Sequence, residues 1–477
     1  MTRSRSVEKR GATRVNFKEE AKQDWESGVG FLPGRETLGP LILMTFTPPF
    51  VLILQHITLH FSGSLTLFLR HVSSIFFSSS LSSSSYVAIL SAALSSTLSA
   101  IPTPFSPSAL RMILSFTAFQ LILTRFIPGP PSHGPVTPQG NTPVYKANGM
   151  SCYIITLLTA LCLDSTGGFS LSRVHEEFGE ILSSLNLLAL LLCFYLYFKG
   201  RSSPTTTDSG TNGGAVLDFY WGLDLYPNIL GWDVKLMTNC RLGMMFWAVG
   251  VISFARASMN ATGSMPLAMF VNAALQIVYV TKFFHWEMGY MCSMDIQVDR
   301  AGYYLCWGCL VWVPCVYTSS SYYLSVHSPD LSPASALLIF LLGYASIYLN
   351  YDADYQRALF RRTGGECVIN LKPPTFIRAS YKTREGKTRE NLLLTSGWWG
   401  VAKHVGYSFE ILSSFFWSSP AGFNGNGMFV PYFYVIFLTI LLVDRSFRDD
   451  DRCRKKYGKD WEKYEETVKY KIIPGLI

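Results

Sequence analysis

Long apolar segments separated by polar loops dominate the chain and set its predicted architecture. Ten segments are apolar enough to be membrane helices, at 38–58, 109–127, 150–164, 181–199, 240–257, 264–282, 302–324, 333–350, 398–417 and 427–443. A helix crosses the hydrocarbon core of a bilayer with about 20 apolar residues. The pattern therefore predicts an all-α fold, a polytopic transmembrane helical protein with about ten transmembrane helices.

The Lys and Arg residues predict which side of the membrane each loop occupies. They concentrate in the N-terminal tail (1–37), in the loop after the eighth segment and in the C-terminal tail. Ten spans place all three on one side, as the positive-inside rule requires, so both termini are expected in the cytosol. The serine-rich run 73–99 is either a loop or an extra span. An extra span would separate the N-terminus from the other basic regions, which favours a lumenal loop over 60–108.

Composition supports a membrane protein and narrows its partners. Only 15% of the 477 residues are charged, against roughly 25% in soluble proteins. The net charge of +8 is spread between apolar segments, which topology explains, so it predicts contact with membrane lipid and not with nucleic acid. The cysteines are scattered, and the tightest cluster, at 306, 309 and 315, lacks a nearby histidine. We therefore predict no metal site.

The stretch "DRSFRDDDRCRKKYGKDWEKY" (444–464) follows the last apolar segment directly. If it continues that helix, Asp449, Cys453 and Tyr457 share one face, and Gly458 ends the helix. Beside them runs a basic stripe made of Arg448, Arg452 and Lys456. Such a face could hold a phosphorylated ligand. Spacing alone favours the simpler interpretation, a solvated end that binds anionic lipid.

Two further regions offer ligand-binding chemistry. Arg357 and Arg361 are four residues apart and would share a helical face that suits a phosphate. Trp399 and Tyr407, in "GWWGVAKHVGY" (397–407), offer flat rings for stacking. From the residues alone, a positive-inside anchor and an interfacial aromatic belt explain these two regions equally simply.

The 444–464 stretch resembles the C-terminal signature of the sterol reductases, Arg-x-x-Arg-Asp-x-x-x-Cys-x-x-Lys-Tyr-Gly-x-x-Trp-x-x-Tyr. Every fixed position is met, by Arg445, Arg448, Asp449, Cys453, Lys456, Tyr457, Gly458, Trp461 and Tyr464. Similarity continues from about residue 128 on, in "GPVTPQGNTPVYKANG", "DFYWGLDLYP", "YVTKFFHWEMGY", "WGCLVWVPCVYTS" and "LLLTSGWWGVAKH". Within the family, these stretches look most like the Δ7-reducing members of plants and algae.

The resemblance implies NADPH-dependent reduction of the C7–C8 double bond of a Δ5,7-sterol, in the endoplasmic reticulum membrane. It implies a cytosolic tail (1–37), a sterol-binding helical region (38–345) and an NADPH-binding region (346–477) whose pocket opens to the cytosol. By motif position the cofactor candidates are Arg357, Arg361, Leu394, Trp399, Gly406, Tyr407, Asp449, Cys453, Arg454, Lys455, Lys456, Tyr457 and Tyr464.

An isolated alkene is not electrophilic, so an acid must protonate one carbon while hydride reaches the other. The resemblance suggests Tyr317, in "WVPCVYTS", and Asp449 for the proton relay. A tyrosine with a pKa of about 10 is protonated at neutral pH and can donate. Glu287, in "FHWEMGY", is a second acid at a membrane edge. Without the resemblance, Tyr317 would be interpreted as a core phenol hydrogen-bonded between helices.

Three alternative functions remain at this point. A sterol C14-reductase performs the same chemistry at another double bond. An isoprenylcysteine-type methyltransferase has a distantly similar C-terminal half, but its cofactor S-adenosylmethionine carries no phosphate, so Arg357 and Arg361 argue for NADPH. A non-enzymatic sterol-binding protein would not need Asp449 and Tyr317, and both are present. Nothing in the sequence indicates a protein partner.

Overall fold

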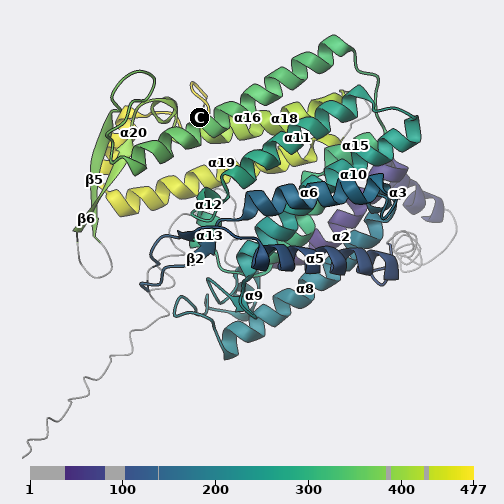
Figure 1. Cartoon of the computed structure of the whole chain (residues 1–477), viewed down its shortest axis with the longest axis horizontal. Helices are drawn as coiled ribbons and strands as arrows, with labels where there is room; N and C mark the ends of the chain where they lie inside the picture. The colour runs from purple at the N-terminus through teal and green to yellow at the C-terminus, as the bar shows by residue number, and fades with distance from the viewer. Residues whose placement is uncertain (1–37, 81–101, 138, 383–387, 424–428, 477) are drawn as a thin grey trace, which may run out of the picture.

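Helices that can span a bilayer form most of the computed structural model, which describes residues 38–80, 102–137, 139–382, 388–423 and 429–476 (Figure 1). Within these ranges, seven helical segments are long and apolar enough to cross a membrane. They are α2 (Leu38–His60), α5 (Pro107–Phe126), α8 (Phe178–Ser202), η1 with α10 (Leu236–Thr262), α11 (Leu267–His285), α16 (Pro333–Arg362) and α19 (Val430–Tyr457). The predicted polytopic all-α class is therefore confirmed.

The other three predicted spans are helical but short or divided. One is α6 (Gly149–Ser165). The second is split into α14 (Tyr303–Trp307), the π-helical η2 (Gly308–Tyr317) and α15 (Ser319–Val326). The third breaks between α17 (Trp398–Val401) and α18 (Val405–Ser418). Pro314 lies within η2, where its missing N–H prevents regular α-helical pairing. The count of ten spans stays a prediction.

The region expected to be a lumenal loop, 60–108, is more structured than its sequence suggested. It contains α3 (Leu65–Ser80), a helix of 16 residues. Its first half is mostly apolar, and its second half, SSIFFSSS, opens the serine-rich run, so the sequence hides the helix. The rest of that run, 81–99, lies outside the described residues, and so does most of the alternative extra span.

Two groups of helices lie side by side in the molecule (Figure 1). In the view of Figure 1, α11, α16, α18 and α19 form the upper group, and α5, α6, α8 and α10 form the lower one. Helix α11 packs against both α10 and α16, and so joins the groups. Short helices fill the connections: α7 (Ser172–Glu176), α9 (Ala215–Trp221), α12 (Glu287–Tyr290), α13 (Met294–Gln297) and η3 (Ser419–Ala421).

Helix α19 continues without a break from its apolar part into the charged stretch that begins at Asp444. This confirms that the 444–457 segment extends the last helix. Gly458 ends it with a φ of 54°, a left-handed conformation that glycine adopts without steric cost. Helix α20 (Lys459–Thr467) then folds back against the strand β5.

Within the part of the chain that the structure describes, three small antiparallel hairpins accompany the helices. They are β1 (Pro131–His133) with β2 (Val144–Lys146), β3 (Asn228–Ile229) with β4 (Trp232–Asp233), and β5 (Phe376–Lys382) with β6 (Thr388–Leu394). The largest pairs Phe376 with Leu394 and Lys382 with Thr388. It projects beyond the helices at the end where α20 lies (Figure 1). The sequence predicts only a basic loop here, so the hairpin is a finding of the structure.

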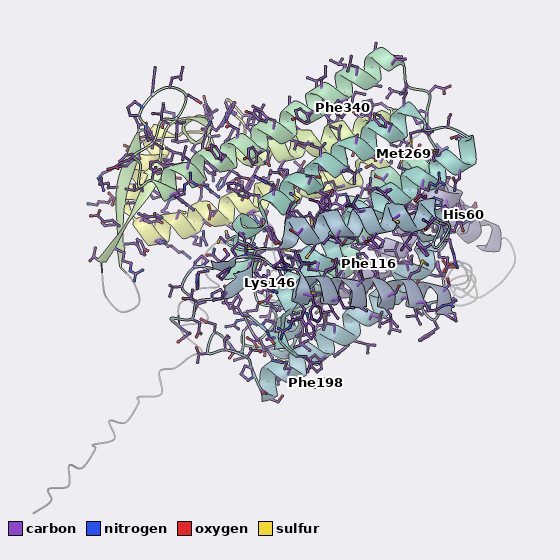
Figure 2. All side chains as sticks on the ribbon, viewed as in Figure 1. His60, Phe116, Lys146, Phe198, Met269 and Phe340 are labelled. Atoms are coloured by element: carbon purple, nitrogen blue, oxygen red, sulfur yellow. The ribbon has the colours of Figure 1, made fainter. Side chains whose placement is uncertain are left out.

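The outer surface of the helices is apolar, as expected for lipid contact. Phe198, at the outside of α8 in Figure 2, is 64% exposed. Polar side chains instead meet inside the bundle. Trp247 Nε1 donates to Gln276 Oε1 at 2.7 Å, and Gln276 Nε2 donates to Ser321 Oγ at 2.7 Å. Hydrogen bonds of this kind satisfy polar groups that would be costly in hydrocarbon.

Candidate functional site

One large cavity, of about 1230 Å³, runs between the two helix groups. Its walls come from α2, α10, α11, η2, α16, α18, α19 and β6. One end lies under the β5–β6 hairpin and is lined by cations; we call it the basic end. The other lies among α2, η2 and α10 and is lined by rings; we call it the aromatic end. A single space thus joins two chemically different surroundings.

Cations from two helices line the basic end. They are Arg357 and Arg361 on α16, and Arg452 and Lys456 on α19. Among the described residues, no carboxylate pairs with Arg357 or Arg361. Arg357 instead lies over the ring of Trp399, at 4.3 Å from its centroid. Two arginines of α16 without an acidic partner, together with Lys456 of α19, suit a ligand that carries several phosphate oxygens.

Aromatic side chains from the end of α19 and from α20 pack against the hairpin at the basic end. Tyr457, Trp461 and Tyr464 pack around Ala379 of β5. Asn391 Nδ2 of β6 donates to the Tyr457 hydroxyl at 2.8 Å. Burial raises the pKa of Tyr464, which keeps its phenol protonated. The hairpin, which the sequence did not predict, therefore forms one wall of the basic end.

A buried ionic network fixes the segment between α17 and α18. Lys403 Nζ lies 3.1 Å from both Asp450 Oδ2 and Glu465 Oε1. The next residue, His404, stacks on Tyr407 with ring centroids 5.0 Å apart. The network ties the broken helix to α19 and α20.

At the aromatic end, Tyr317 of η2 lies between rings from α10 and α19. Its ring centroid is 4.4 Å from that of Tyr434 and 5.1 Å from that of Trp247. No hydrogen bond joins the Tyr317 hydroxyl to another described side chain. The remaining walls here are formed by Leu43, Thr47, Tyr303, Trp307, Trp312 and Phe437. This surface suits a flat, rigid hydrocarbon.

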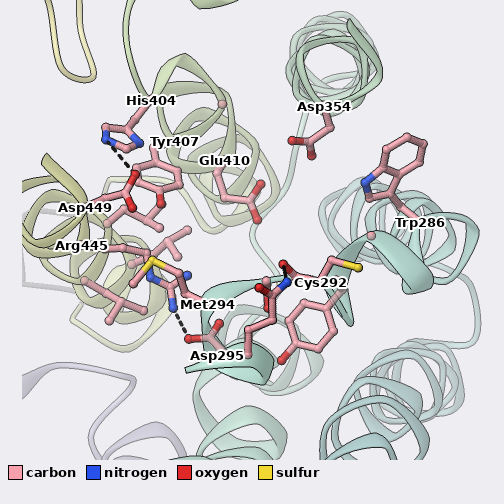
Figure 3. A pocket seen from close by; sticks show the side chains of 18 of the residues that line it. Trp286, Cys292, Met294, Asp295, Asp354, His404, Tyr407, Glu410, Arg445 and Asp449 are labelled. Atoms are coloured by element: carbon pink, nitrogen blue, oxygen red, sulfur yellow. Dashed lines mark hydrogen bonds and ion pairs between the residues drawn. The ribbon is translucent and has the colours of Figure 1, made fainter. Parts of the chain in front are cut away.

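Acidic side chains lie between the two ends (Figure 3). Asp295 of α13 forms an ion pair with Arg445 of α19. Across the cavity, Glu410 of α18 accepts a hydrogen bond from the Tyr279 hydroxyl, and Asp354 of α16 points toward the same space. The sequence analysis did not select these acids. The available signal for Glu410 was a charge inside a predicted apolar span, which by default indicates function.

Most of the predicted site residues line this one cavity. They are Tyr317, Arg357, Arg361, Leu394, Trp399, Gly406, Tyr407, Asp449, Cys453, Lys456, Tyr457 and Tyr464. Arg454 and Lys455 are not among them, because they lie on the solvent side of α19. There Arg454 pairs with Glu465 at 2.9 Å. The structure brings twelve candidates together and leaves these two outside.

Glu287 also lies outside the cavity. It begins α12, is 2% exposed and forms an ion pair with Arg241. The same guanidinium donates to Asn148 Oδ1 at 3.0 Å. A carboxylate closed into a buried pair has no access to a substrate in the cavity. The geometry therefore assigns Glu287 to the folded frame and does not support the expected role as an acid.

Tyr317 and Asp449 line the same cavity but not the same part of it. Tyr317 contacts Tyr434, and Asp449 comes fifteen residues later on the same helix. At 1.5 Å per residue this is about 22 Å of helix. Asp449 is instead held at the basic end by Arg452, at 2.8 Å. The two residues of the predicted relay are therefore not brought into hydrogen-bond contact.

Comparisons with known proteins identify the family. The model of the "Ergosterol biosynthesis ERG4/ERG24 family" matches residues 56–477. An Arabidopsis thaliana 7-dehydrocholesterol reductase is 46% identical over 91% of this chain and 96% of its own length. The Danio rerio protein of the same name is 34% identical over 78% and 80%. A Delta(14)-sterol reductase from Methylotuvimicrobium alcaliphilum is 32% identical over 75% and 80%. The chain therefore belongs to the ERG4/ERG24 family of sterol reductases.

Proposed function

We propose that this chain reduces the C7–C8 double bond of a Δ5,7-sterol with NADPH. The observation that carries the proposal is the single cavity that joins unpaired arginines at one end to an aromatic surface with Tyr317 at the other. The identity of 46% to a 7-dehydrocholesterol reductase, against 32% to a Delta(14)-sterol reductase, supports Δ7- over Δ14-reduction. Membership of a sterol biosynthesis family supports the endoplasmic reticulum membrane as its location.

The basic end fits NADPH by the chemistry of its residues. Arg357, Arg361 and Lys456 would hold phosphate oxygens, and the rings of Trp399 and Tyr407 offer faces for stacking. When bound, NADPH supplies the hydride. S-Adenosylmethionine would leave these cations without a partner, which argues against a methyltransferase.

The aromatic end supports the protonation half of the reaction. Tyr317 lines a cavity that is walled here by aromatic rings, where a sterol carbon can approach its hydroxyl. Protonation of one alkene carbon creates the electron deficiency that hydride needs at the other. In this proposal the Tyr317 hydroxyl donates the proton, and Asp449 belongs to the cofactor site at the basic end.

The test is expression of the chain in yeast that lacks its own sterol reductases. Microsomes receive NADPH and, in separate arms, a Δ5,7-sterol or a Δ8,14-sterol, and the products are identified by mass spectrometry. We expect reduction at C7–C8. Reduction only in the second arm would establish a C14-reductase instead, and reduction in neither arm would contradict the proposed enzyme class.

A further inference from the structure

Each turnover of the proposed reaction removes a proton from the cavity, and the structure indicates where its replacement enters. The alkene gains one hydride from the cofactor and one proton from the Tyr317 hydroxyl, which leaves a phenolate. That phenolate must regain one proton from solvent before the next turnover. Asp449 lies about 22 Å of helix from the aromatic end. A nearer acid is therefore required.

Two other acids in the cavity are connected to the aromatic end. Asp295 is one, but it forms an ion pair with Arg445. The Arg445 guanidinium already engages the Asp295 carboxylate. Glu410 is the other, and its partner is a phenol: the Tyr279 hydroxyl donates to Glu410 Oε1. A carboxyl hydrogen-bonded to a phenol can exchange a proton with it.

A line of polar groups connects Glu410 to the exposed end of α16. Asp354, with a side chain 33% exposed, lies 3.8 Å from Lys282 Nζ. Lys282 donates to Asn350 Oδ1, and Asn350 also contacts the Glu410 carboxyl. All four side chains line the cavity. The carboxyls of Asp354 and Glu410 face the same space (Figure 3).

On its inner side, Glu410 reaches the aromatic end through Tyr279. The Tyr279 ring packs on Trp247 at 5.3 Å between centroids, and Trp247 packs on Tyr317 at 5.1 Å. Tyr279, Tyr317 and Tyr434 are close enough for their hydroxyls to interact electrostatically. All three line the cavity, which leaves room for a water molecule to bridge the phenols.

We propose that Glu410 and Tyr279 form the inner part of a proton path, which runs from Asp354 and Lys282 to Tyr317. After each protonation of substrate, Tyr279 gives its proton to the Tyr317 phenolate and takes one from the Glu410 carboxyl. The Glu410 carboxylate is then reprotonated from solvent through the Asp354 opening. Glu410 acts through Tyr317 and does not itself touch the sterol. This inference rests on the proposed function, because it requires Tyr317 to be the donor.

The test compares full-length wild type with Glu410→Gln, Glu410→Asp and Tyr279→Phe, in microsomes and after purification in detergent. A matched control is Glu366→Gln, which changes an exposed glutamate outside the cavity. For Glu410→Gln we expect a first turnover close to the wild-type rate, because Tyr317 already carries its proton. Steady-state turnover should fall by at least about tenfold and show a larger solvent deuterium isotope effect.

Three further readouts separate a proton path from a structural role. Glu410→Asp should keep much of the wild-type steady-state rate. Small weak acids such as azide should restore much of that rate to Glu410→Gln, which they would not do if the substitution had only disturbed packing. Binding of NADP⁺, followed by tryptophan fluorescence, should be unchanged in Glu410→Gln. Tyr279→Phe keeps the ring and should reproduce the slow steady state, so the inference remains testable if Glu410→Gln does not fold.

Several outcomes would overturn the path. An unchanged steady-state rate and isotope effect in Glu410→Gln would exclude it, and so would equal losses in the first and later turnovers. If Asp295→Asn, and not Glu410→Gln, showed a fast first turnover followed by a slow steady state, Asp295 would be the source of the proton. A wild-type protein that does not reduce the Δ5,7-sterol would contradict the proposed function, whereas an active wild type with an unaffected Glu410→Gln contradicts the path alone.

Discussion

The two ends of the cavity are built on different principles. The basic end takes Arg357, Arg361, Arg452 and Lys456 from two helices at i, i+4 spacing, so its chemistry repeats along the sequence. The aromatic end gathers rings from α10, from α14 with η2, and from α19, three segments that are distant in the chain. A site made of helix faces can be recognised from spacing, whereas one made of long-range contacts requires the fold.

The largest expected effect tests the aromatic end. Tyr317→Phe removes one hydroxyl and keeps the ring contacts with Trp247 and Tyr434. Loss of a proton donor typically lowers a rate by about 100- to 10,000-fold, so we expect a fall in kcat of that size in microsomes. NADPH binding, measured by fluorescence, should be unchanged. Tyr344→Phe, at an exposed tyrosine, is the control, and a Tyr317→Phe protein with normal kcat would remove Tyr317 from the mechanism.

The next prediction concerns an acid that belongs to neither end. Glu287→Gln leaves the Arg241 guanidinium buried without its carboxylate. Breaking one side of a buried ion pair costs about 3–5 kcal/mol, so we expect a clearly lower midpoint of thermal unfolding in detergent. Activity per folded molecule should stay near that of wild type. A Glu287→Gln protein that is stable but inactive would instead indicate that Glu287 takes part in the reaction.

Substitution of a cation at the basic end should weaken the affinity for NADPH. Arg361→Ala removes a charged hydrogen-bond donor from the cofactor end, which is worth about 1.5–3 kcal/mol. We therefore expect KM for NADPH to rise about 10- to 100-fold, with KM for the sterol little changed. Arg362→Ala is the matched control, because this neighbour does not line the cavity. Equal effects of the two variants would mean that general charge, and not the site, attracts the cofactor.

The smallest effect is expected on the solvent side of α19. Arg454→Ala removes an exposed pair with Glu465, and surface pairs of this kind contribute about 0–1 kcal/mol. NADPH kinetics should stay within about twofold of wild type, whereas Lys456→Ala, two residues away on the cavity side, should raise KM. A rise of similar size in Arg454→Ala would place this arginine in the cofactor site after all.

Sequence reasoning predicted the helical architecture, and most of the site residues it selected line the cavity, for identifiable reasons. Apolar runs predict spans directly, and the charged end of α19 has a fixed motif. It missed the β5–β6 hairpin, whose strand residues Phe376–Lys382 contain charges and read as a loop. It also selected Glu287 and passed over Glu410. Both are acids near apolar segments, and only the fold shows that one meets Arg241 and the other Tyr279.

The unbroken length of α19 has a mechanical consequence. One rigid rod carries Tyr434 beside Tyr317 at one end and the Asp449–Tyr457 face at the other. The helix therefore fixes both the distance between the two binding surfaces and their relative rotation about its axis. One extra residue inserted between Leu438 and Leu442 would turn the cofactor face by about 100°. Four extra residues would nearly restore the rotation but would move the two surfaces about 6 Å further apart. The number of residues between the two surfaces is therefore itself a constraint on the enzyme.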